Sequence, residues 1–323
     1  MDILISEDLD SPAIEKLAKK YSIVREPALW KDSAKLKNLL GEARAVMVRN
    51  QTQLTAEILS DAKNLLAIGR VGVGLDNIDV KCATERGIVV IAPLSANATS
   101  VAELTLGLML SLARKIPFSD RSTKFGEWDR KNCTGIELDR KTILICGFGR
   151  IGRMVAARAK AFGLRIIVFD PLIEENSTHI GEVGATLATK LEDGLAVADF
   201  VTVHLPLTTE TKHLFNAKTF AAMKVGSFFI NTSRGGVMDE MALLIALQTN
   251  HLGGAALDVR EIEPPKEKSA FGEMDNVILT PHIGAFTNEA QTRTMECVCD
   301  DLERVLSGQP AINFVNFPQP PAK

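Results

Sequence analysis

The feature that most constrains this chain is a regular alternation of short apolar runs with helical patterns along its 323 residues. Runs such as Ile3–Ile5, Ala45–Val48 and Ile88–Ile91 have the length and the composition of buried strands. Amphipathic stretches such as Ser11–Lys20 lie between them. Because parallel neighbouring strands need a crossover connection, which is usually a helix, this alternation predicts a parallel sheet covered by helices.

A second series of strand-like runs follows the first. Its members are Ile143–Ile145, Ile166–Phe169, Phe200–Val203, Phe228–Ile230, Ala255–Leu257 and Val277–Leu279. Two such series predict an α/β protein with two doubly wound, Rossmann-like parallel-sheet domains. The apolar segment Ser100–Arg114 is expected to make the first crossing between them, and the helical segment Thr287–Leu306 to lead back to the first. We therefore expect a discontinuous domain of residues 1–98 plus 291–323 and a second domain of residues 99–290.

Charge and composition argue against several classes of protein. The 37 basic and 40 acidic residues give a net charge of -3, so no nucleic-acid partner is expected. Apolar stretches reach only about ten residues, which is too short to cross a bilayer, and the first residues have no secretory-signal pattern. The five cysteines are scattered without a metal-ligand spacing. We expect reduced thiols, no metal, no membrane partner and a cytoplasmic location.

A glycine-rich turn follows the first strand of the second series and precedes a helix expected at Arg153–Phe162. Its glycines have separate tasks: Gly147 permits the tight turn, Gly149 lets backbone N–H groups approach a pyrophosphate, and Gly152 lets the helix pack closely on the strand. Asp170 follows the next strand, where a carboxylate accepts hydrogen bonds from ribose hydroxyls and repels a 2′-phosphate. The sequence therefore predicts NAD as the cofactor rather than NADP.

Polar side chains also follow other strands of this series. Arg234, Asp258, Glu263 and His282 come after successive strand ends, and His204 follows another. Because ligands of open α/β sheets bind at the carboxyl ends of strands, we expect the first four to face one crevice beside the nicotinamide. An arginine that grips a carboxylate, a histidine that exchanges a proton and a carboxylate that orients it suit hydride transfer at an alcohol or carbonyl carbon.

The motifs together resemble those of the NAD-dependent D-2-hydroxyacid dehydrogenases. The matching segments, in the family's order, are Gly147–Gly152 with Asp170, Val203–Thr208, Asn231–Asp239, Ala256–Val259 with Glu263-Pro264, and Thr280–Gly284. The likeness extends over nearly the whole chain. It implies that Arg234 binds and polarises the substrate, that His282 exchanges the hydroxyl proton, and that Glu263 holds His282 in place.

The resemblance also implies the cofactor contacts and the assembly. The cofactor would touch Gly147, Gly149, Arg150, Ile151, Gly152, Asp170, His204, Pro206, Thr211, Thr232, Asp258 and Gly284. The discontinuous domain would bind the substrate and the other domain would bind NAD. The chain would form a homodimer built around Ser100–Arg140.

Two segments, Val48–Asn50 and Gly69–Asp79, look most like those of the 3-phosphoglycerate dehydrogenases within this family. They would bring Arg49, Asn50, Arg70, Gly72, Val73 and Gly74 to the substrate. Two arginines and a run of backbone amides suit a substrate with an anion beyond its carboxylate. Two residues depart from the usual pattern: Val73 replaces a frequent threonine, and Arg260 replaces an aromatic or apolar residue. Arg260 either adds a cation near the site or faces solvent.

The preferred substrate pair is 3-phosphoglycerate and 3-phosphohydroxypyruvate, and alternatives stay open. The run Gly72–Asn77 also looks like that of sulfolactate dehydrogenases, and hydroxypyruvate or glyoxylate reduction is a further possibility. A protein of another class, a nucleotide-sensing binding protein like some co-repressors, needs appended tails that we do not expect here. We also expect no serine-sensing regulatory domain. Formate dehydrogenases carry Gln at the position of Glu263, which argues against that activity.

Overall fold

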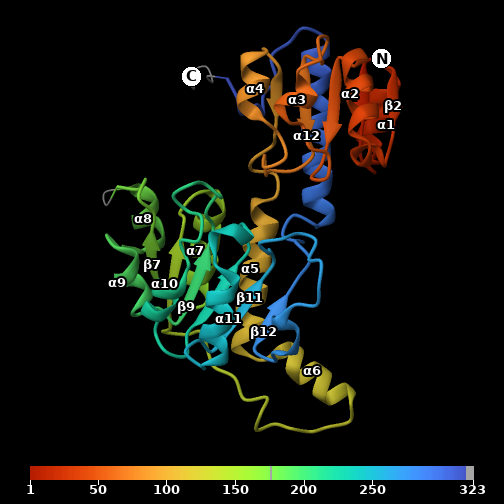
Figure 1. Ribbon diagram of the computed structural model, residues 1–323. Coiled ribbons are helices and arrows are strands. Elements are labelled where there is room, and N and C mark those ends of the chain that lie inside the picture. Colours follow the sequence, from red (N-terminus) through yellow and green to blue (C-terminus); the bar gives the residue numbers. More distant parts are fainter. Residues whose placement is uncertain (175–176, 318–323) are drawn as a thin grey trace. The chain divides into compact units, whose positions relative to one another are not determined.

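The computed structural model describes residues 1–174 and 177–317, and the chain forms two compact units (Figure 1). The first unit is Met1–Asn97 with the chain from Ala285 onward, and the second is Ala98–Gly284. Residues 285–290, which we expected in the second domain, belong with the first, and residue 98 belongs with the second. The reason is local, because the Arg49 guanidinium lies over the ring of Phe286, 4.6 Å from its centroid. Residues 318–323 of the expected first domain lie outside the described residues.

The first unit is built on a five-stranded parallel sheet in the order β2-β1-β3-β4-β5. Its strands are β1 (Ile3–Ile5), β2 (Ile23–Arg25), β3 (Ala45–Val48), β4 (Ala67–Arg70) and β5 (Val89–Ile91). Its helices are α1 (Pro12–Ala18), α2 (Ser33–Glu42), α3 (Ala56–Leu59), α4 (Val80–Glu85) and α12 (Asn288–Leu306), with a 3₁₀ turn η1 (Leu29–Lys31). The sequence reading missed β2, because this short edge strand is only partly buried and has a weak apolar pattern.

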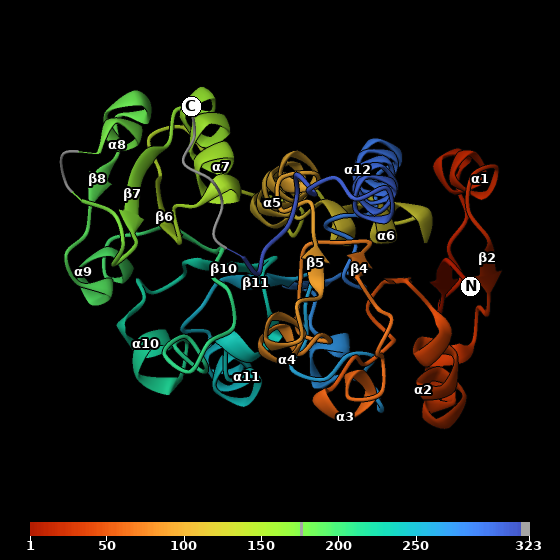
Figure 2. The same cartoon turned by 90° about the horizontal axis from the view of Figure 1, so that it is seen from above.

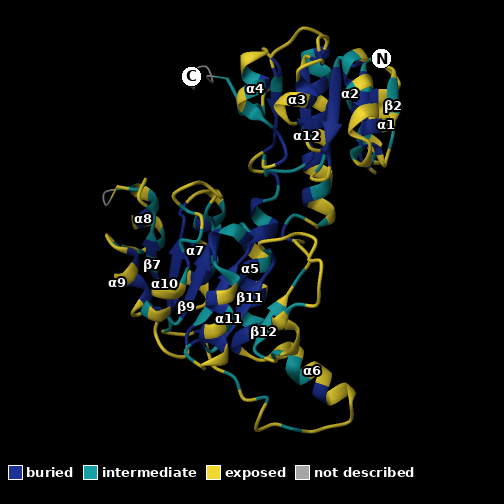
Figure 3. Ribbon diagram, viewed as in Figure 1, coloured by how far each residue is buried: buried dark blue, intermediate teal, exposed yellow. Residues whose placement is uncertain are grey.

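Helices cover both faces of this sheet, because successive strand residues point to opposite sides. Leu4 and Val46 pack in one core with α2, α3 and α4, whereas Ile3 and Met47 pack in another with α1 and α12. Figure 2 shows these two helical layers, and Figure 3 shows the strands buried between them. Burial on both faces explains why the strands read as continuous apolar runs.

The second unit carries a seven-stranded parallel sheet in the order β12-β11-β10-β9-β6-β7-β8. Its strands are β6 (Thr142–Cys146), β7 (Arg165–Phe169), β8 (Thr186–Leu187), β9 (Phe200–Val203), β10 (Phe228–Asn231), β11 (Gly254–Leu257) and β12 (Val277–Leu279). Its helices are α5 (Ala98–Ala113), α6 (Ile116–Lys124), α7 (Arg150–Ala161), α8 (Thr178–Val183), α9 (Leu191–Leu195), α10 (Ala217–Ala222) and α11 (Glu240–Gln248), with 3₁₀ turns η2 (Gly235–Val237) and η3 (Ala270–Glu273). The two-residue edge strand β8 was not expected. The two sheets confirm the predicted α/β class with two doubly wound parallel sheets.

The strand order of the second sheet indicates the edge at which a ligand would bind. The chain runs outward from β6 through β7 to β8 and then crosses back to β9, on the other side of β6. Ligands of such sheets bind at the carboxyl ends of the strands where the order reverses. The glycine-rich turn after Cys146 and the residue His204 after β9 both lie at this reversal, and the His204 N–H donates to the Cys146 carbonyl at 2.8 Å.

The long apolar helix α5 belongs to the interior of the second unit. Its buried residues include Val101, Thr105, Met109 and Leu112, which recur at helical spacing. These residues face α7 and the strands β10 and β11. Among the helices of residues 1–174 and 177–317, none is both long and apolar enough to cross a membrane.

A buried carboxylate shapes the loop after β3 in the first unit. Glu7 follows β1 and is 4 % exposed. It accepts hydrogen bonds from the backbone N–H groups of Arg49 at 2.8 Å, Thr52 at 3.0 Å and Gln51 at 3.2 Å. Three backbone donors compensate the carboxylate for lost water, so Glu7 fixes the path of the chain at Arg49 and Asn50.

Replacing Glu7 by alanine should destabilise this unit, because the substitution leaves buried N–H groups without an acceptor. We expect the free energy of unfolding to fall by about 3 kcal/mol, with faster amide exchange at Arg49 and Thr52. Urea denaturation followed by hydrogen exchange measures both. Glu15→Ala, which removes an exposed carboxylate from α1, should change little. A Glu7→Ala midpoint equal to that of the control would show that these bonds do not hold the loop.

Candidate active site

The glycine-rich turn has the backbone geometry that its sequence requires. Gly147 has a φ of 92°, and a Cβ built there would lie 2.6 Å from the His204 carbonyl oxygen. A Cβ at Gly152 would lie 2.1 Å from the carbonyl oxygen of Gly147. No side chain fits at either position, so the first turn of α7 packs directly on the end of β6.

The start of α7 fits a pyrophosphate. The helix begins at Arg150, earlier than the expected Arg153, because Gly149 takes the N-cap position. Gly149 offers no capping side chain, and within the described residues no side chain accepts from the N–H groups of Arg150, Ile151 or Gly152. A Cβ at Gly149 would meet nothing within 4 Å. Free N–H groups and open space at a helix N-terminus are what an anionic phosphate needs.

Asp170 links the turn to the end of β7. Its Oδ2 accepts a hydrogen bond from the Phe148 N–H at 2.8 Å, and its Oδ1 accepts one from the Leu172 N–H at 2.9 Å. The side chain is half-buried, and a carboxylate has further lone pairs on both oxygens. The residue therefore holds the turn in shape and still has acceptor capacity for a ribose.

His204 has a buried ring whose two nitrogens find no hydrogen-bond partner among the described residues. Burial lowers its pKa to about 3, so the ring is neutral. A neutral imidazole has one donor and one acceptor, and leaving both unpaired is unfavourable. This unpartnered ring, beside the turn at Gly147, indicates a polar partner that the described residues do not supply.

Other expected cofactor residues have local partners. The Thr211 hydroxyl donates to the Pro206 carbonyl at 2.6 Å and so shapes the loop after β9. The hydroxyls of Thr232 and Thr105 lie 2.9 Å apart in the interior. Both contacts order the edge of the sheet that carries His204.

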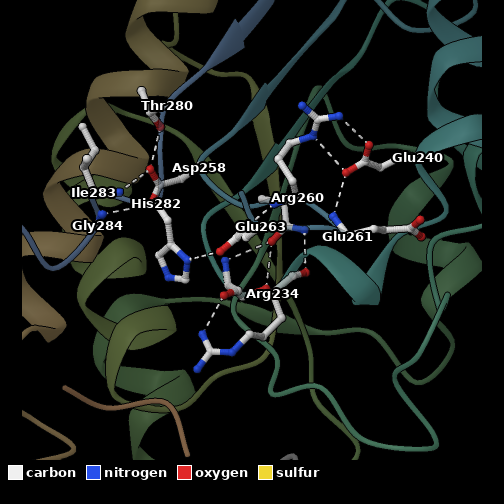
Figure 4. A network of polar contacts seen from close by, with 12 residues as sticks. Arg234, Glu240, Asp258, Arg260, Glu261, Glu263, Thr280, His282, Ile283 and Gly284 are labelled. Carbon is white, nitrogen blue, oxygen red and sulfur yellow. Dashed lines mark hydrogen bonds and ion pairs between the residues drawn. The ribbon is translucent and has the colours of Figure 1, made fainter. Parts of the chain in front are cut away.

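The three expected catalytic residues gather at the carboxyl edge of this sheet (Figure 4). His282 Nδ1 lies 2.6 Å from Glu263 Oε2. Burial raises the pKa of Glu263, but the hydrogen bonds from His282 and from the Arg260 N–H, with the charges of His282 and Arg234, outweigh it and lower the pKa. Glu263 is therefore ionised near neutral pH and accepts a hydrogen bond from the N–H at His282 Nδ1. The His282 side chain is 47 % exposed.

His282 adopts a left-handed backbone conformation, with a φ of 56°. Asp258, which is 1 % exposed, holds the loop in this shape. Its Oδ1 accepts from the Thr280 hydroxyl at 2.6 Å and from the Ile283 N–H at 2.8 Å, and its Oδ2 accepts from the Gly284 N–H at 2.8 Å. Both oxygens of Asp258 are thus engaged by the loop that carries His282.

We expected Arg260 either to add a cation near the site or to face solvent, and the structure shows neither. It does not face solvent, because its side chain is only 16 % exposed, and it is not a spare cation. Its Nε and Nη2 donate to the two carboxylate oxygens of Glu240 at 2.9 and 2.6 Å. Glu240 neutralises the guanidinium, which explains why an arginine is tolerated where an apolar residue is usual.

Two contributors to the site went unrecognised in the sequence. Asn231 accepts from the N–H and hydroxyl of Ser233 and donates to the Arg234 carbonyl at 3.0 Å, so it sets the loop that carries Arg234. Glu240 follows Asp239, the N-cap of α11. The position of Glu240 at the start of a helix, just after the loop of Arg234, could have marked it as a site residue. Its partner Arg260 could not be predicted, because it comes from another loop.

In the first unit, Arg49 contacts side chains from the segment that begins at Ala285. Its guanidinium lies over Phe286 and hydrogen-bonds to the Gln291 side-chain oxygen. Burial lowers its pKa, and the charge of Glu7 partly opposes this effect. A guanidinium stays protonated at neutral pH, so Arg49 is a fixed cation. Asn50, next to it, is exposed.

Arg70, which was expected to contact the substrate, donates two hydrogen bonds within its own loop. It is 8 % exposed, and its Nε and Nη1 donate to the carbonyls of Gly74 at 2.8 Å and Val71 at 2.7 Å. A Cβ at Gly72 would lie 2.3 Å from Nη1, so a glycine is needed there. Within the described residues the N–H groups of Val73 and Gly74 have no backbone acceptor. Arg70 thus shapes a loop whose amides are available to an anion.

Comparison with known proteins agrees with this geometry. The family described as "D-isomer specific 2-hydroxyacid dehydrogenase, NAD binding domain" matches residues 106–284, which make up most of the second unit. The D-3-phosphoglycerate dehydrogenase of Methanocaldococcus jannaschii is 43% identical over 319 residues, which cover 99% of this chain and 60% of that protein. The chain therefore spans about three-fifths of the length of this curated relative.

Solved structures share the fold over the whole chain. The TT0316 protein from Thermus thermophilus is 32% identical with a TM-score of 0.90, covering 98% of this chain and 100% of that one. The D-lactate dehydrogenase from Aquifex aeolicus, complexed with NAD and lactic acid, is 29% identical with a TM-score of 0.87, covering 99% and 100%. The chain therefore belongs to the D-isomer specific 2-hydroxyacid dehydrogenase family, and its second unit is the NAD-binding domain of that family.

Proposed function

We propose that this chain is an NAD-dependent dehydrogenase that interconverts a small anionic D-2-hydroxy acid and its 2-oxo acid. The preferred pair is 3-phosphoglycerate and 3-phosphohydroxypyruvate. The observation that carries the proposal is the 2.6 Å contact of His282 with Glu263, beside Arg234, at the carboxyl edge of the NAD-binding sheet. Relatives named D-3-phosphoglycerate dehydrogenase, at 40–43% identity, support the choice of substrate.

The three residues have separate tasks in this reaction. Arg234 binds the substrate carboxylate through its planar fork and polarises the C2 oxygen. Glu263 keeps the proton of His282 on Nδ1, which leaves Nε2 to take the hydroxyl proton as the acid is oxidised and to return it on reduction. NAD held at this edge would supply the acceptor for the C2 hydride and its electron pair, so oxidation would yield the 2-oxo acid, NADH and the proton held by His282.

The cofactor would lie along the edge that the glycine-rich turn opens. The N–H groups of Gly149, Arg150, Ile151 and Gly152 would hold the pyrophosphate, and Asp170 would accept from the adenosine ribose. The remaining contacts are proposed for Gly147, His204, Pro206, Thr211, Thr232, Asp258 and Gly284. The two unpartnered nitrogens of His204 support a cofactor contact at that residue.

The substrate contacts are proposed for the first unit. Arg49 would bind an anion beyond the carboxylate, with Asn50 beside it. The amides of Val73 and Gly74 would take a second anionic group. Gly72, whose N–H donates to the Arg70 carbonyl at 2.8 Å, and Arg70 would act by holding their loop. Residues 1–97 with the chain from 285 onward are thus proposed as the substrate-binding domain.

We also propose a homodimer and a cytoplasmic location. Phe125 is 82 % exposed and Trp128 is 75 % exposed in the segment after α6. Large apolar side chains at this exposure support an interface with a second copy. Five free cysteines support a reducing compartment.

Replacing His282 by alanine should remove the proton acceptor and leave the glycine-rich turn intact. General acid–base groups contribute about 10²–10⁴-fold in rate, so we expect kcat to fall by that factor. The Kd for NADH, followed by fluorescence titration, should stay within about twofold. Lys218→Ala, which removes an 82 % exposed cation from α10, is the control. Unchanged turnover in His282→Ala would overturn the proposed role.

Replacing Asp170 by alanine should weaken NAD binding and relax the preference for NAD over NADP. Loss of hydrogen bonds to a charged acceptor predicts a KM for NAD raised by about tenfold or more. Because Asp170 also holds the turn, Asp170→Asn is the closer comparison, since it keeps the size of the side chain, removes the charge and retains an acceptor for one of the two backbone N–H groups. Initial rates with both cofactors measure the preference. If both variants still discriminate fully against NADP, Asp170 does not set the choice.

Replacing Arg49 by methionine should separate substrates by their second anion. We expect kcat/KM for 3-phosphoglycerate to fall by about 10–100-fold, because a charged hydrogen-bond partner is lost, with little change for lactate or glycerate. Arg25→Met, at an exposed arginine of β2, is the control. Equal losses on all substrates would make Arg49 structural. On the unmodified enzyme the same panel, with sulfolactate added, tests the proposed function itself, and no turnover of any member would overturn it.

A further inference from the structure

The loop between β11 and β12 is anchored by an ion pair that neither the sequence pattern nor the proposed reaction uses. Glu240, the first residue of α11, accepts two hydrogen bonds from the Arg260 guanidinium. Its Oε1 also accepts the backbone N–H of Glu261 at 2.7 Å. One carboxylate therefore ties both the side chain of Arg260 and the peptide that follows it. We call these three residues the Glu240 clamp (Figure 4).

The clamp is built as a fixed contact rather than a loose surface pair. The Arg260 and Glu240 side chains are 16 % and 18 % exposed. The Arg260 guanidinium also lies 5.4 Å from the ring centroid of Phe271, a buried residue of η3. Bidentate geometry, partial burial and an aromatic neighbour all restrict the side chain, whereas exposed ion pairs contribute little.

The clamped backbone contacts both halves of the candidate catalytic group. On one side, the Arg260 N–H donates to Glu263 Oε1 at 2.8 Å, and the other oxygen of Glu263 contacts His282. On the other side, the Arg260 carbonyl lies against Gly235, where a Cβ would come within 1.9 Å of it. Gly235 is the residue after Arg234. The peptide of Arg260 thus lies between the loop of Arg234 and the carboxylate that orients His282.

We propose that Glu240 and Arg260 are positioning residues that set the orientation of Glu263, and through it the tautomer and placement of His282. Neither side chain touches a reacting atom. They act through the backbone of Arg260, whose N–H directs one oxygen of Glu263 so that the other meets His282 Nδ1. This inference rests on the proposed function for its kinetic consequence, and on the contacts alone for its structural one.

The test removes the ion pair of the clamp without leaving an unpaired charge. Glu240→Gln with Arg260→Met replaces both partners by neutral side chains of similar size, which limits destabilisation. Small displacements of catalytic groups lower rates by up to about a hundredfold, so we expect kcat to fall by about ten- to a hundredfold. The Kd for NADH should stay within about twofold, because the glycine-rich turn is untouched. Arg260→Lys, which keeps one charged contact to Glu240, should retain more activity than the double variant.

A second readout observes His282 directly. In the full enzyme labelled with ¹⁵N-histidine, the His282 signals, assigned with His282→Gln, should show protonation fixed on Nδ1. In the double variant they should show exchange between tautomers. Arg158→Met, which breaks the Arg158–Glu103 pair of the same unit, is the matched control and should change neither readout.

The two readouts separate the inference from the proposed function. An active enzyme whose double variant keeps the original kcat and the original His282 spectrum would overturn the positioning role. A fall in kcat with an unchanged His282 spectrum would also overturn it, because the loss would then not pass through His282. An unmodified enzyme inactive on every hydroxy acid of the panel would overturn the proposed function, and the spectra would still decide whether the clamp orients His282.

Discussion

The hydrogen bonds that Asp258 accepts from the loop after β12 hold His282 where the candidate chemistry needs it. A non-glycine residue with a φ of 56° is disfavoured on its own. It persists because a buried carboxylate engages the residues on both sides, Thr280 and Ile283, and then Gly284. Burying that carboxylate is tolerable for the same reason, since its oxygens are met by three donors. Loop and carboxylate stabilise each other.

The parallel register explains why the candidate catalytic group comes from three separate segments. Asn231 of β10 lies beside Leu257 of β11, and Leu257 lies beside Leu279 of β12. The three strands therefore end at the same level, and the loops that follow begin side by side. A guanidinium, a carboxylate and an imidazole supplied by successive loops can meet there without any close spacing in sequence. Contacts such as that of Arg260 with Gly235 then keep the loops in register with one another.

Sequence reasoning worked where backbone chemistry is local. Both series of central strands, the glycine-rich turn and the alignment of polar residues after strand ends follow from apolar runs and glycine spacing. Edge strands β2 and β8 were missed because they are short and partly exposed, so they carry little apolar signal. The partners of Arg260 and Arg70 could not be predicted from the sequence, for another reason. An arginine in a sequence shows its charge but not its acceptor, and here one guanidinium binds Glu240 while the other binds carbonyls of its own loop.

The partners of these two guanidinium groups reduce the positive charge that is available to a substrate. A count of arginines near the strand ends suggested several cations for an anionic substrate. Arg260 is neutralised by Glu240, and Arg70 donates hydrogen bonds to the carbonyls of Val71 and Gly74. Arg49 differs, because the side chains that contact its guanidinium, Phe286 and Gln291, are uncharged, and the Glu7 carboxylate acts on it through its charge. Contact with neutral side chains cancels less of the charge of a guanidinium than the bidentate contact of Glu240 with Arg260 does, so Arg49 keeps more attraction for a further anion. In the first unit, the proposed recognition of a phosphate or sulfonate would therefore depend on Arg49 and on backbone amides of the loop that Arg70 supports.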